Sequence, residues 1–253
     1  MSSHEQDLWN CMQRHIAALA AEKKVNNTFR RLETSKQQQV ILAILDALAE
    51  RPHGINIKMI ARDAGVSVGS MYQYFPNRDA MVSFAVTLTA RTTVESLHEY
   101  EAYFDSLPLR ASLTQFLLGS IEWSEGLGPF LKLFARCAYH GDDLFREELV
   151  RPIATAIREM VFRILTAARA RGEIREGVDI DAAARLVNSF FITVADALLL
   201  PHLNHYFQVF SSSHPDAVRG RLLEAVEFVL RSIEAPKFSK EVPNVGERDD
   251  RLR

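Results

Sequence analysis

The chain has 253 residues, a net charge of −2 and 47% apolar residues, which is the composition of an ordinary globular protein with a substantial core. The small net charge excludes a protein that coats nucleic acid over its whole surface, so any affinity for DNA must come from a local basic surface. No apolar run reaches about 18 residues, so we expect no membrane span.

The two cysteines, Cys11 and Cys137, are far apart in the sequence and form neither a disulfide framework nor a CxxC zinc pattern. The first residues, SSHEQD after Met1, are not a basic start followed by an apolar signal core. We therefore expect a protein of the reducing cytoplasm. Glycine and proline are scarce, and no long polar–apolar alternation is present, which favours helices over sheets.

Residues 1–34 are predicted to form an N-terminal extension. Helical spacing of apolar residues runs over 5–25. The window 22–36 then carries five positive and two negative charges, and is the most basic stretch before the first well-defined helix. Such a basic arm could add phosphate or minor-groove contacts to DNA, or it could simply be solvated.

That first well-defined helix is predicted over 35–51. It begins at Thr34, which fits a capping box with Gln37, or one residue later. It ends before Pro52, because the residue preceding a proline avoids the α region. Its buried face is predicted to comprise Val40, Ile41, Ile44, Leu45 and Leu48.

Two short helices follow. Asn56 is a plausible N-cap of the first, and Gly65 stands where a left-handed residue commonly ends a helix. Ser67 can cap the second, which runs to Tyr74, and Asn77 can cap the next helix along the chain. The first short helix has an apolar stripe with i, i+3, i+4, i+7 spacing, formed by Ile57, Ile60, Ala61 and Ala64.

The rest of the chain also predicts helices, with a break expected at Gly126–Pro129. The fold class is therefore all-α, with an N-terminal three-helix helix-turn-helix domain at 35–84 and a C-terminal helical domain at 85–234. The charged tail at 235–253 is expected to be disordered. The predicted helices after Asn77 span 78–104, 109–124, 126–140, 142–172, 179–206 and 214–234.

The segment Ala64–Ser67 has the tight, glycine-containing form that a helix-turn-helix requires between its two helices. The second helix must then present small or polar residues outward, so that its backbone can approach the major groove. Val68 and Gly69 are poor helix formers, which is understandable if a base edge or phosphate comes close there. Taken alone, an Ala-Gly helix hairpin is also common in ordinary packing.

The longer run around this turn contains the segments Ile60-Ala61, Ala64-Gly65-Val66-Ser67, Gly69-Ser70-Met71-Tyr72, Tyr74-Phe75 and Asn77-Arg78-Asp79. Together these segments resemble the signature of the TetR family. Members of that family are all-α dimers with an N-terminal DNA-binding domain and a C-terminal domain for ligand binding and dimerisation. Most are repressors that a small molecule releases from DNA. The resemblance implies a palindromic double-stranded operator and a small, mostly apolar effector as partners, and no enzymatic activity.

The resemblance also implies which residues contact DNA. Asn56 replaces the usual threonine cap and is expected to reach a phosphate. Arg78 stands where a lysine is usual and would contact a phosphate at a helix N-terminus. Tyr74 stands where histidine is common, and Gln73 could instead be solvated. The remaining implied contacts lie in and just before the second short helix: Ser67, Val68, Gly69, Ser70 and Tyr72.

The C-terminal helices 179–206 and 214–234 are predicted to form the homodimer interface. The first is apolar over more than one face, so it must be buried on two sides. A dimer also follows from DNA recognition, because one short helix contacts too few bases. The middle helices are expected to hold the effector, although their aromatic residues could equally be core. The candidate pocket residues are Phe116, Trp123, Phe130, Phe134, Arg136, Cys137, His140, Phe191 and Asp196.

Two other classes of protein stay open from the residues alone: an all-α enzyme and a helical adaptor that uses the C-terminal helices. No GxSxG, HExxH, P-loop or dinucleotide-binding pattern favours the enzyme. His202 and His205 could share a metal-binding face, but the local pattern lacks a third ligand. We therefore predict no metal and no cofactor. Cys137 could be a redox sensor, although the sequence does not show its charge environment.

Overall fold

The structure, a computed structural model, describes residues 3–50, 54–140, 145–207 and 215–236. All regular elements in these ranges are helical, which confirms the predicted all-α class. The tail was predicted to be disordered over 235–253, but Ala235 is buried and its N–H donates to the carbonyl of Glu173 (2.7 Å). Residues 237–253 lie outside the described residues. The elements are α1 (Ser3–Ala21), α2 (Asn27–Arg30), α3 (Thr34–Glu50), α4 (Ile57–Asp63), α5 (Val68–Tyr74), α6 (Arg78–Glu99), α7 (Glu101–Ser106), α8 (Leu109–His140), the π-helical turn η1 (Arg146–Val150), α10 (Arg151–Ala170), α11 (Ile180–Leu199), α12 (Pro201–Phe207) and α13 (Pro215–Ile233).

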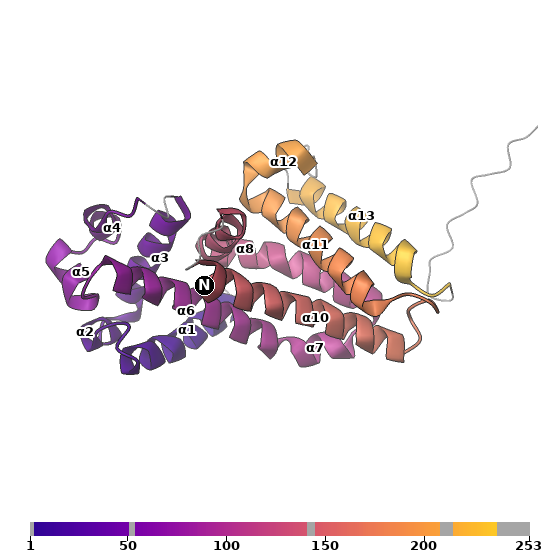
Figure 1. Cartoon of the computed structure of the whole chain (residues 1–253), viewed down its shortest axis with the longest axis horizontal. Coiled ribbons are helices and arrows are strands. Elements are labelled where there is room, and N and C mark those ends of the chain that lie inside the picture. Colours follow the sequence, from indigo (N-terminus) through magenta and orange to yellow (C-terminus); the bar gives the residue numbers. More distant parts are fainter. Residues whose placement is uncertain (1–2, 51–53, 141–144, 208–214, 237–253) are drawn as a thin grey trace, which may run out of the picture.

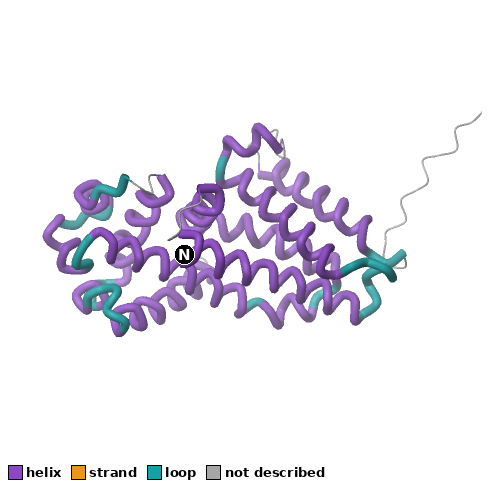
Figure 2. The backbone as a smooth tube through the Cα atoms, viewed as in Figure 1, coloured by secondary structure: helices purple, strands orange, loops and turns teal. Residues whose placement is uncertain are grey.

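The helices gather into two ends of an elongated molecule (Figures 1 and 2). Helices α2 to α5 lie at one end, α7, α10, α11 and α13 at the other, and α6 and α8 run between them. Each end has its own buried apolar cluster. The first cluster joins α1 to α6 with the last part of α8 and η1, and the second joins the start of α8 to α7, α10, α11 and α13.

The N-terminal extension is folded onto the helix-turn-helix. Helix α1 packs along α6 and buries a stripe at helical spacing: Leu8, Met12, Ile16 and Leu19. The basic window is not a free arm in this structure, because Val25 and Phe29 are fully buried within it. Phe29 lies on the short helix α2, and Val25 lies in the bend just before it.

Helix boundaries differ from the predicted ones at three places. The break expected at Gly126–Pro129 is absent, and α8 continues through it from Leu109 to His140. Helix α8 is held by α3 on one side and by α11 and α13 on another, and such tertiary packing overrides weak local propensity. The predicted helix 78–104 is divided at Tyr100 into α6 and α7, and 179–206 is divided before Pro201. No helix among the described residues is long and apolar enough to cross a membrane.

Candidate nucleic-acid interface

The turn between α4 and α5 depends on one glycine. Gly65 has φ +61°, a left-handed backbone conformation that residues other than glycine rarely adopt. Its N–H donates to the carbonyl of Arg62 (3.0 Å), and the N–H of Val66 donates to that of Ala61 (2.9 Å). These bonds satisfy carbonyls at the end of α4 and turn the chain at once into α5.

Three predicted N-caps form as expected. The Asn56 side chain accepts from the N–H of Lys58 (2.9 Å), Ser67 Oγ accepts from Ser70 (2.9 Å), and Asn77 accepts from Ala80 (2.8 Å). Each cap begins one of the helices α4, α5 and α6. Asn56 and Ser67 are thus occupied by the fold through one acceptor atom, while their side chains remain exposed.

Helix α5 divides into a buried and an outward face. Met71 packs into the core, whereas Gly69, Tyr72 and Gln73 are exposed and Val68 and Ser70 are partly so. The Tyr72 side chain is 53% exposed, which is unusual for a large aromatic residue. A short, capped helix that presents polar and aromatic side chains outward is typical of recognition in the DNA major groove.

Gly69 has no internal role in the fold. Its backbone is not left-handed, and a Cβ placed on it would have Ser67 Oγ, 3.7 Å away, as its nearest contact. Glycine inside a helix costs about 0.5–1 kcal/mol relative to alanine, so the fold alone would favour a side chain here. The missing side chain therefore leaves room for something outside the protein.

Tyr74 is placed differently from its predicted role as a DNA contact. It is only 6% exposed, and its ring packs edge-on against Phe29 at 5.6 Å. The position falls three residues after Met71, on the same inward face of α5. Phe75 beside it is also buried, and its ring contacts those of Phe29 and Phe84.

The N-terminal extension holds the end of the recognition helix α5. The N–H of Asn26 donates to the carbonyl of Tyr74 (2.9 Å), and its side-chain amide donates to the carbonyl of Gln73 (2.9 Å). Lys36 of α3 donates to the carbonyl of Gly65 at the other end of the motif (3.1 Å). These supporting residues were not predicted, because nothing in the local sequence ties Asn26 to a helix nearly fifty residues further along the chain.

Gln37 has a different role from the predicted capping box with Thr34. It is buried, and its amide donates to the carbonyls of Phe29 (3.0 Å) and Arg30 (3.1 Å), while its oxygen accepts from Gln13 (2.6 Å). Both carbonyls lie at the end of α2, where carbonyls have no partner further along the helix, and that of Phe29 also accepts from the N–H of Leu32 (3.0 Å). Gln37 therefore joins α1, α2 and α3 around the helix-turn-helix.

Positive charge lies close to the exposed face of α5. Lys58 and Arg62 on α4 and Arg78 at the start of α6 are exposed. Arg62 also pairs with its neighbour Asp63 (2.9 Å), an exposed pair that costs little to open. Arg78 keeps its predicted position at a helix N-terminus, where backbone N–H groups also favour a phosphate.

The residues predicted to line one effector pocket do not come together. Phe116 and Phe191 stack at 6.2 Å in the second apolar cluster. The other apolar cluster, near the helix-turn-helix, buries Phe130, Phe134 and Cys137. Asp196 is buried on α11, Arg136 is half-buried, and the Trp123 and His140 side chains lie outside the described ones. These aromatic residues are mainly core, since positions far apart on the long helix α8 serve different clusters.

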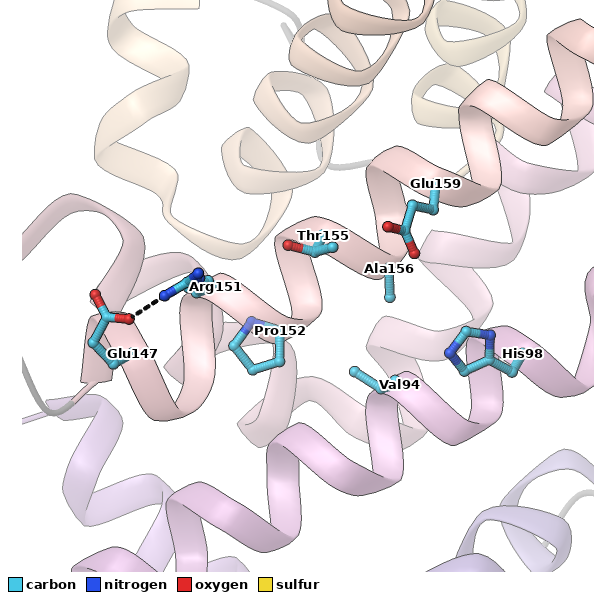
Figure 3. Close-up of a pocket in the computed structure, with 8 residues that line it drawn as sticks. All are labelled: Val94, His98, Glu147, Arg151, Pro152, Thr155, Ala156 and Glu159. Carbon is cyan, nitrogen blue, oxygen red and sulfur yellow. Dashed lines mark hydrogen bonds and ion pairs between the residues drawn. The ribbon is translucent and has the colours of Figure 1, made fainter.

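Two adjoining grooves instead follow α6. One, of about 420 Å³, lies between α6 and the η1–α10 segment, and Figure 3 shows Val94 and His98 facing Pro152 and Ala156 across it. The other, of about 580 Å³, shares part of this lining and extends to α1 at His15 and Lys24. Both volumes fall within the range of small-molecule sites. Sequence spacing could not reveal them, because their walls come from three separate segments.

The caps, the left-handed turn and the outward face of α5 define a helix-turn-helix DNA-binding protein. The family described as bacterial regulatory proteins, tetR family, matches residues 44–83, which contain this motif. Over this segment the chain therefore carries the DNA-binding domain of that family.

Solved structures share the fold over most of this chain at low sequence identity. A TetR family transcriptional regulator from Chloroflexus aurantiacus is 19% identical, with a TM-score of 0.59, over 83% of this chain and 99% of that one. KstR2 of Mycobacterium tuberculosis, a ketosteroid transcriptional regulator, is 18% identical (TM-score 0.56; 81% and 97% covered). FadR of Bacillus subtilis, solved with stearoyl-CoA, is 20% identical (TM-score 0.53; 75% and 97% covered). At these identities the likeness concerns the fold.

Proposed function

We propose that this regulator is a repressor that binds a palindromic operator as a homodimer and leaves it when a small, largely apolar effector binds. The observation that carries the DNA-binding part is Gly69, a helix position where the fold has room for a side chain and gains nothing from its absence. In the proposed complex the backbone of α5 lies against the major groove at this residue. Around Gly69, bases or phosphates are contacted by Asn56, Ser67, Val68, Ser70, Tyr72, Gln73 and Arg78.

Helices α11 and α13 are proposed to form the dimer interface. Leu186 on α11 and Phe228 on α13 are each 72% exposed, and Leu223 on α13 is also exposed. Large apolar side chains that are this exposed on two neighbouring helices indicate a surface that binds a protein partner. A second copy of the chain places two recognition helices on one face, about one turn of DNA apart.

The effector is proposed to bind in the grooves along α6. Their apolar wall includes Val94 and Pro152, and their rim carries charged residues such as Lys24 and Arg91. FadR bound to stearoyl-CoA and the ketosteroid regulator KstR2 support an effector with a large apolar part. Because α6 begins at Arg78, directly after the helix-turn-helix, a molecule wedged between α6 and α10 would move the recognition helices.

The test is a DNA-binding titration of the full chain with the region upstream of its own gene. Tyr72→Ala is expected to weaken binding by about tenfold or more, roughly 1.4 kcal/mol, without changing thermal stability, because the side chain is exposed. Affinity should also fall steeply with salt if phosphates dominate. The matched control is Tyr103→Ala, an equally exposed tyrosine on α7. An equal loss with both variants, or no binding at low salt to this region or to genomic palindromes, contradicts the proposal.

A further inference from the structure

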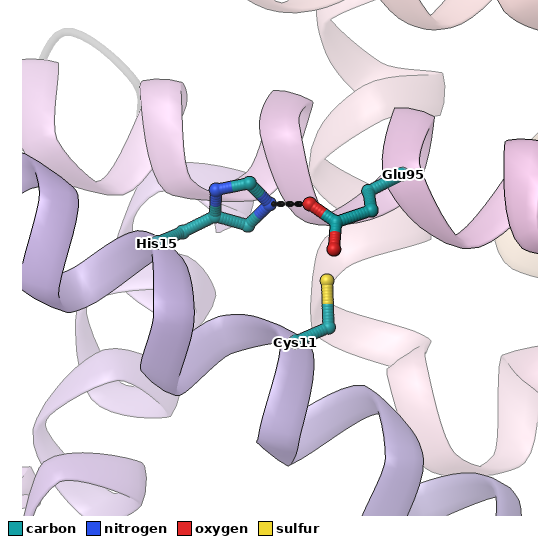
Figure 4. Close-up of side chains that lie close together, drawn as sticks. All are labelled: Cys11, His15 and Glu95. Atoms are coloured by element: carbon teal, nitrogen blue, oxygen red, sulfur yellow. Dashed lines mark ion pairs between the residues drawn. The ribbon is translucent and has the colours of Figure 1, made fainter.

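Three side chains with metal-binding atoms meet where α1 lies along α6. Cys11 and His15 are four residues apart on α1, so they share one face, and Glu95 lies opposite on α6 (Figure 4). The sulfur, a ring nitrogen and a carboxylate oxygen all lie within 4.8 Å of one another. His15 Nε2 is 2.8 Å from Glu95 Oε2.

The contact between His15 and Glu95 is an ion-pair contact rather than a well-aligned hydrogen bond. His15 Nε2 is buried and, despite its closeness to Glu95, makes no hydrogen bond of acceptable geometry with any described residue. In the neutral imidazole one ring nitrogen carries no proton, and such a nitrogen can bind a metal ion. The nitrogen faces the same space as the Cys11 sulfur and the Glu95 carboxylate (Figure 4).

The donor set selects the kind of metal. One sulfur, one imidazole nitrogen and one carboxylate oxygen suit a borderline-soft divalent ion such as Zn²⁺, rather than Mg²⁺ or Ca²⁺. Tetrahedral zinc with bonds of about 2.0–2.3 Å holds its ligand atoms roughly 3.3–3.7 Å apart. The three side chains therefore need to move by about 1 Å or less from the positions they already have.

The surroundings complete the site. Arg14 holds Glu95 Oε1 through Nη2 (2.5 Å) and Nε (3.2 Å), which orients the carboxylate with Oε2 toward His15. Such a second partner commonly fixes a ligand in metal sites. His15 and Glu95 also line the groove of about 580 Å³, so water can reach a fourth coordination position.

We propose that Cys11, His15 and Glu95 form a zinc-class metal site that joins the N-terminal helix α1 to α6. On binding, the Cys11 thiol gives its proton to solvent and the sulfur forms the metal–thiolate bond, while His15 and Glu95 supply the nitrogen and oxygen ligands. The thiolate and the carboxylate together balance the two charges of the ion.

A thiol redox sensor at Cys11 is disfavoured by the same geometry. The residue is 1% exposed, so an oxidant in solution cannot reach its sulfur, and burial also raises the pKa of its thiol.

The test is a cobalt titration of the full-length, tag-free protein after treatment with a chelator. One Co²⁺ per chain is expected to give a thiolate-to-cobalt charge-transfer band and the intense visible bands of tetrahedral cobalt, and Zn²⁺ should abolish both. Cys11→Ser should remove the charge-transfer band and weaken binding at least about 100-fold, since losing a residue that only orients a ligand already costs roughly 10- to 100-fold. Cys137→Ser, the matched control for the other buried thiol, should leave the band unchanged.

Glu95→Gln keeps the proposal testable if Cys11→Ser folds poorly, because Glu95 is a partly exposed residue. It should retain the charge-transfer band but bind cobalt about 10-fold or more weakly. Circular dichroism checks the fold of each variant. The proposal is overturned if the wild-type protein shows no charge-transfer band, if the band persists in Cys11→Ser, or if it disappears in Cys137→Ser.

Discussion

The two ends of the molecule differ in how their residues are constrained. At the helix-turn-helix, individual backbone positions demand particular chemistry, as the left-handed Gly65 and the caps Asn56 and Ser67 illustrate. In the C-terminal bundle, α10, α11 and α13 need only apolar residues at helical spacing, and many such residues are interchangeable. The first end therefore carries a specific signature, whereas the second specifies little beyond its fold.

The largest expected effect on stability tests whether the N-terminal extension is part of the core at the DNA-binding end. Phe29→Ala removes a fully buried ring that lies 5.5–5.6 Å from the rings of Tyr74, Phe75 and Phe84. Loss of such a ring is expected to cost about 3–5 kcal/mol of unfolding free energy, measured by urea denaturation. The neighbouring exposed residue serves as control, and Thr28→Ala should change stability by less than about 0.5 kcal/mol. A cost below about 1 kcal/mol for Phe29→Ala would show that the extension is not part of this core.

The next effect tests the bundle end. Leu186→Glu places a charge in the proposed dimer interface and should raise the dimer dissociation constant about 100-fold, or roughly 2.7 kcal/mol. Sedimentation equilibrium measures it. Phe162→Glu, at another exposed apolar residue on α10, should leave the dimer intact. If Phe162→Glu dissociates the dimer and Leu186→Glu does not, the interface lies on α10 instead.

A smaller effect tests the link between the extension and the recognition helix. Asn26→Ala removes the side-chain bond to the carbonyl of Gln73, which should cost about 1 kcal/mol and weaken operator binding several-fold. Asn27→Ala is the control, because Asn27 is exposed and shows no side-chain bond among the described residues. Equal operator affinity for the two variants, measured by fluorescence anisotropy, would mean that this bond does not position α5.

The smallest stability effect has a sign opposite to its effect on binding. Gly69→Ala should stabilise the protein by about 0.5–1 kcal/mol, since the new Cβ meets no close neighbour, yet it should weaken operator binding. Gly119→Ala in α8 also has open space around its Cβ, and should stabilise the fold with operator affinity unchanged. An undiminished affinity in Gly69→Ala would remove the main support for close DNA approach at this residue.

The helix-turn-helix could be predicted from sequence because its signals are local. Caps, turn and apolar stripe all lie between Asn56 and Asn77, and each has a physical requirement for its residue type. The inward position of Tyr74 was not predicted, because the expectation of a DNA contact came only from its place in the family signature. The residue instead packs into the buried cluster around Phe29.

Features that depend on distant segments could not be predicted. The contact of Cys11 and His15 with Glu95 requires α1 to lie along α6, and no spacing in the sequence expresses this. The continuity of α8 through Gly126 and Pro129 likewise depends on neighbours on both sides, because those residues considered alone favour a break.

The continuous helix α8 has a consequence for how movement passes between the two ends of the molecule. Its 32 residues span about 48 Å, with Leu113 near one end in the bundle core and Leu133 near the other in the DNA-binding core. A helix cannot bend or stretch without straining its hydrogen bonds. A tilt of α8 at one end therefore displaces its other end. Gly126 and Pro129 lie between the two cores, and the proline leaves one backbone hydrogen bond unmade. The two ends have separate cores but share one stiff helix, and the turn with the missing hydrogen bond lies between those cores.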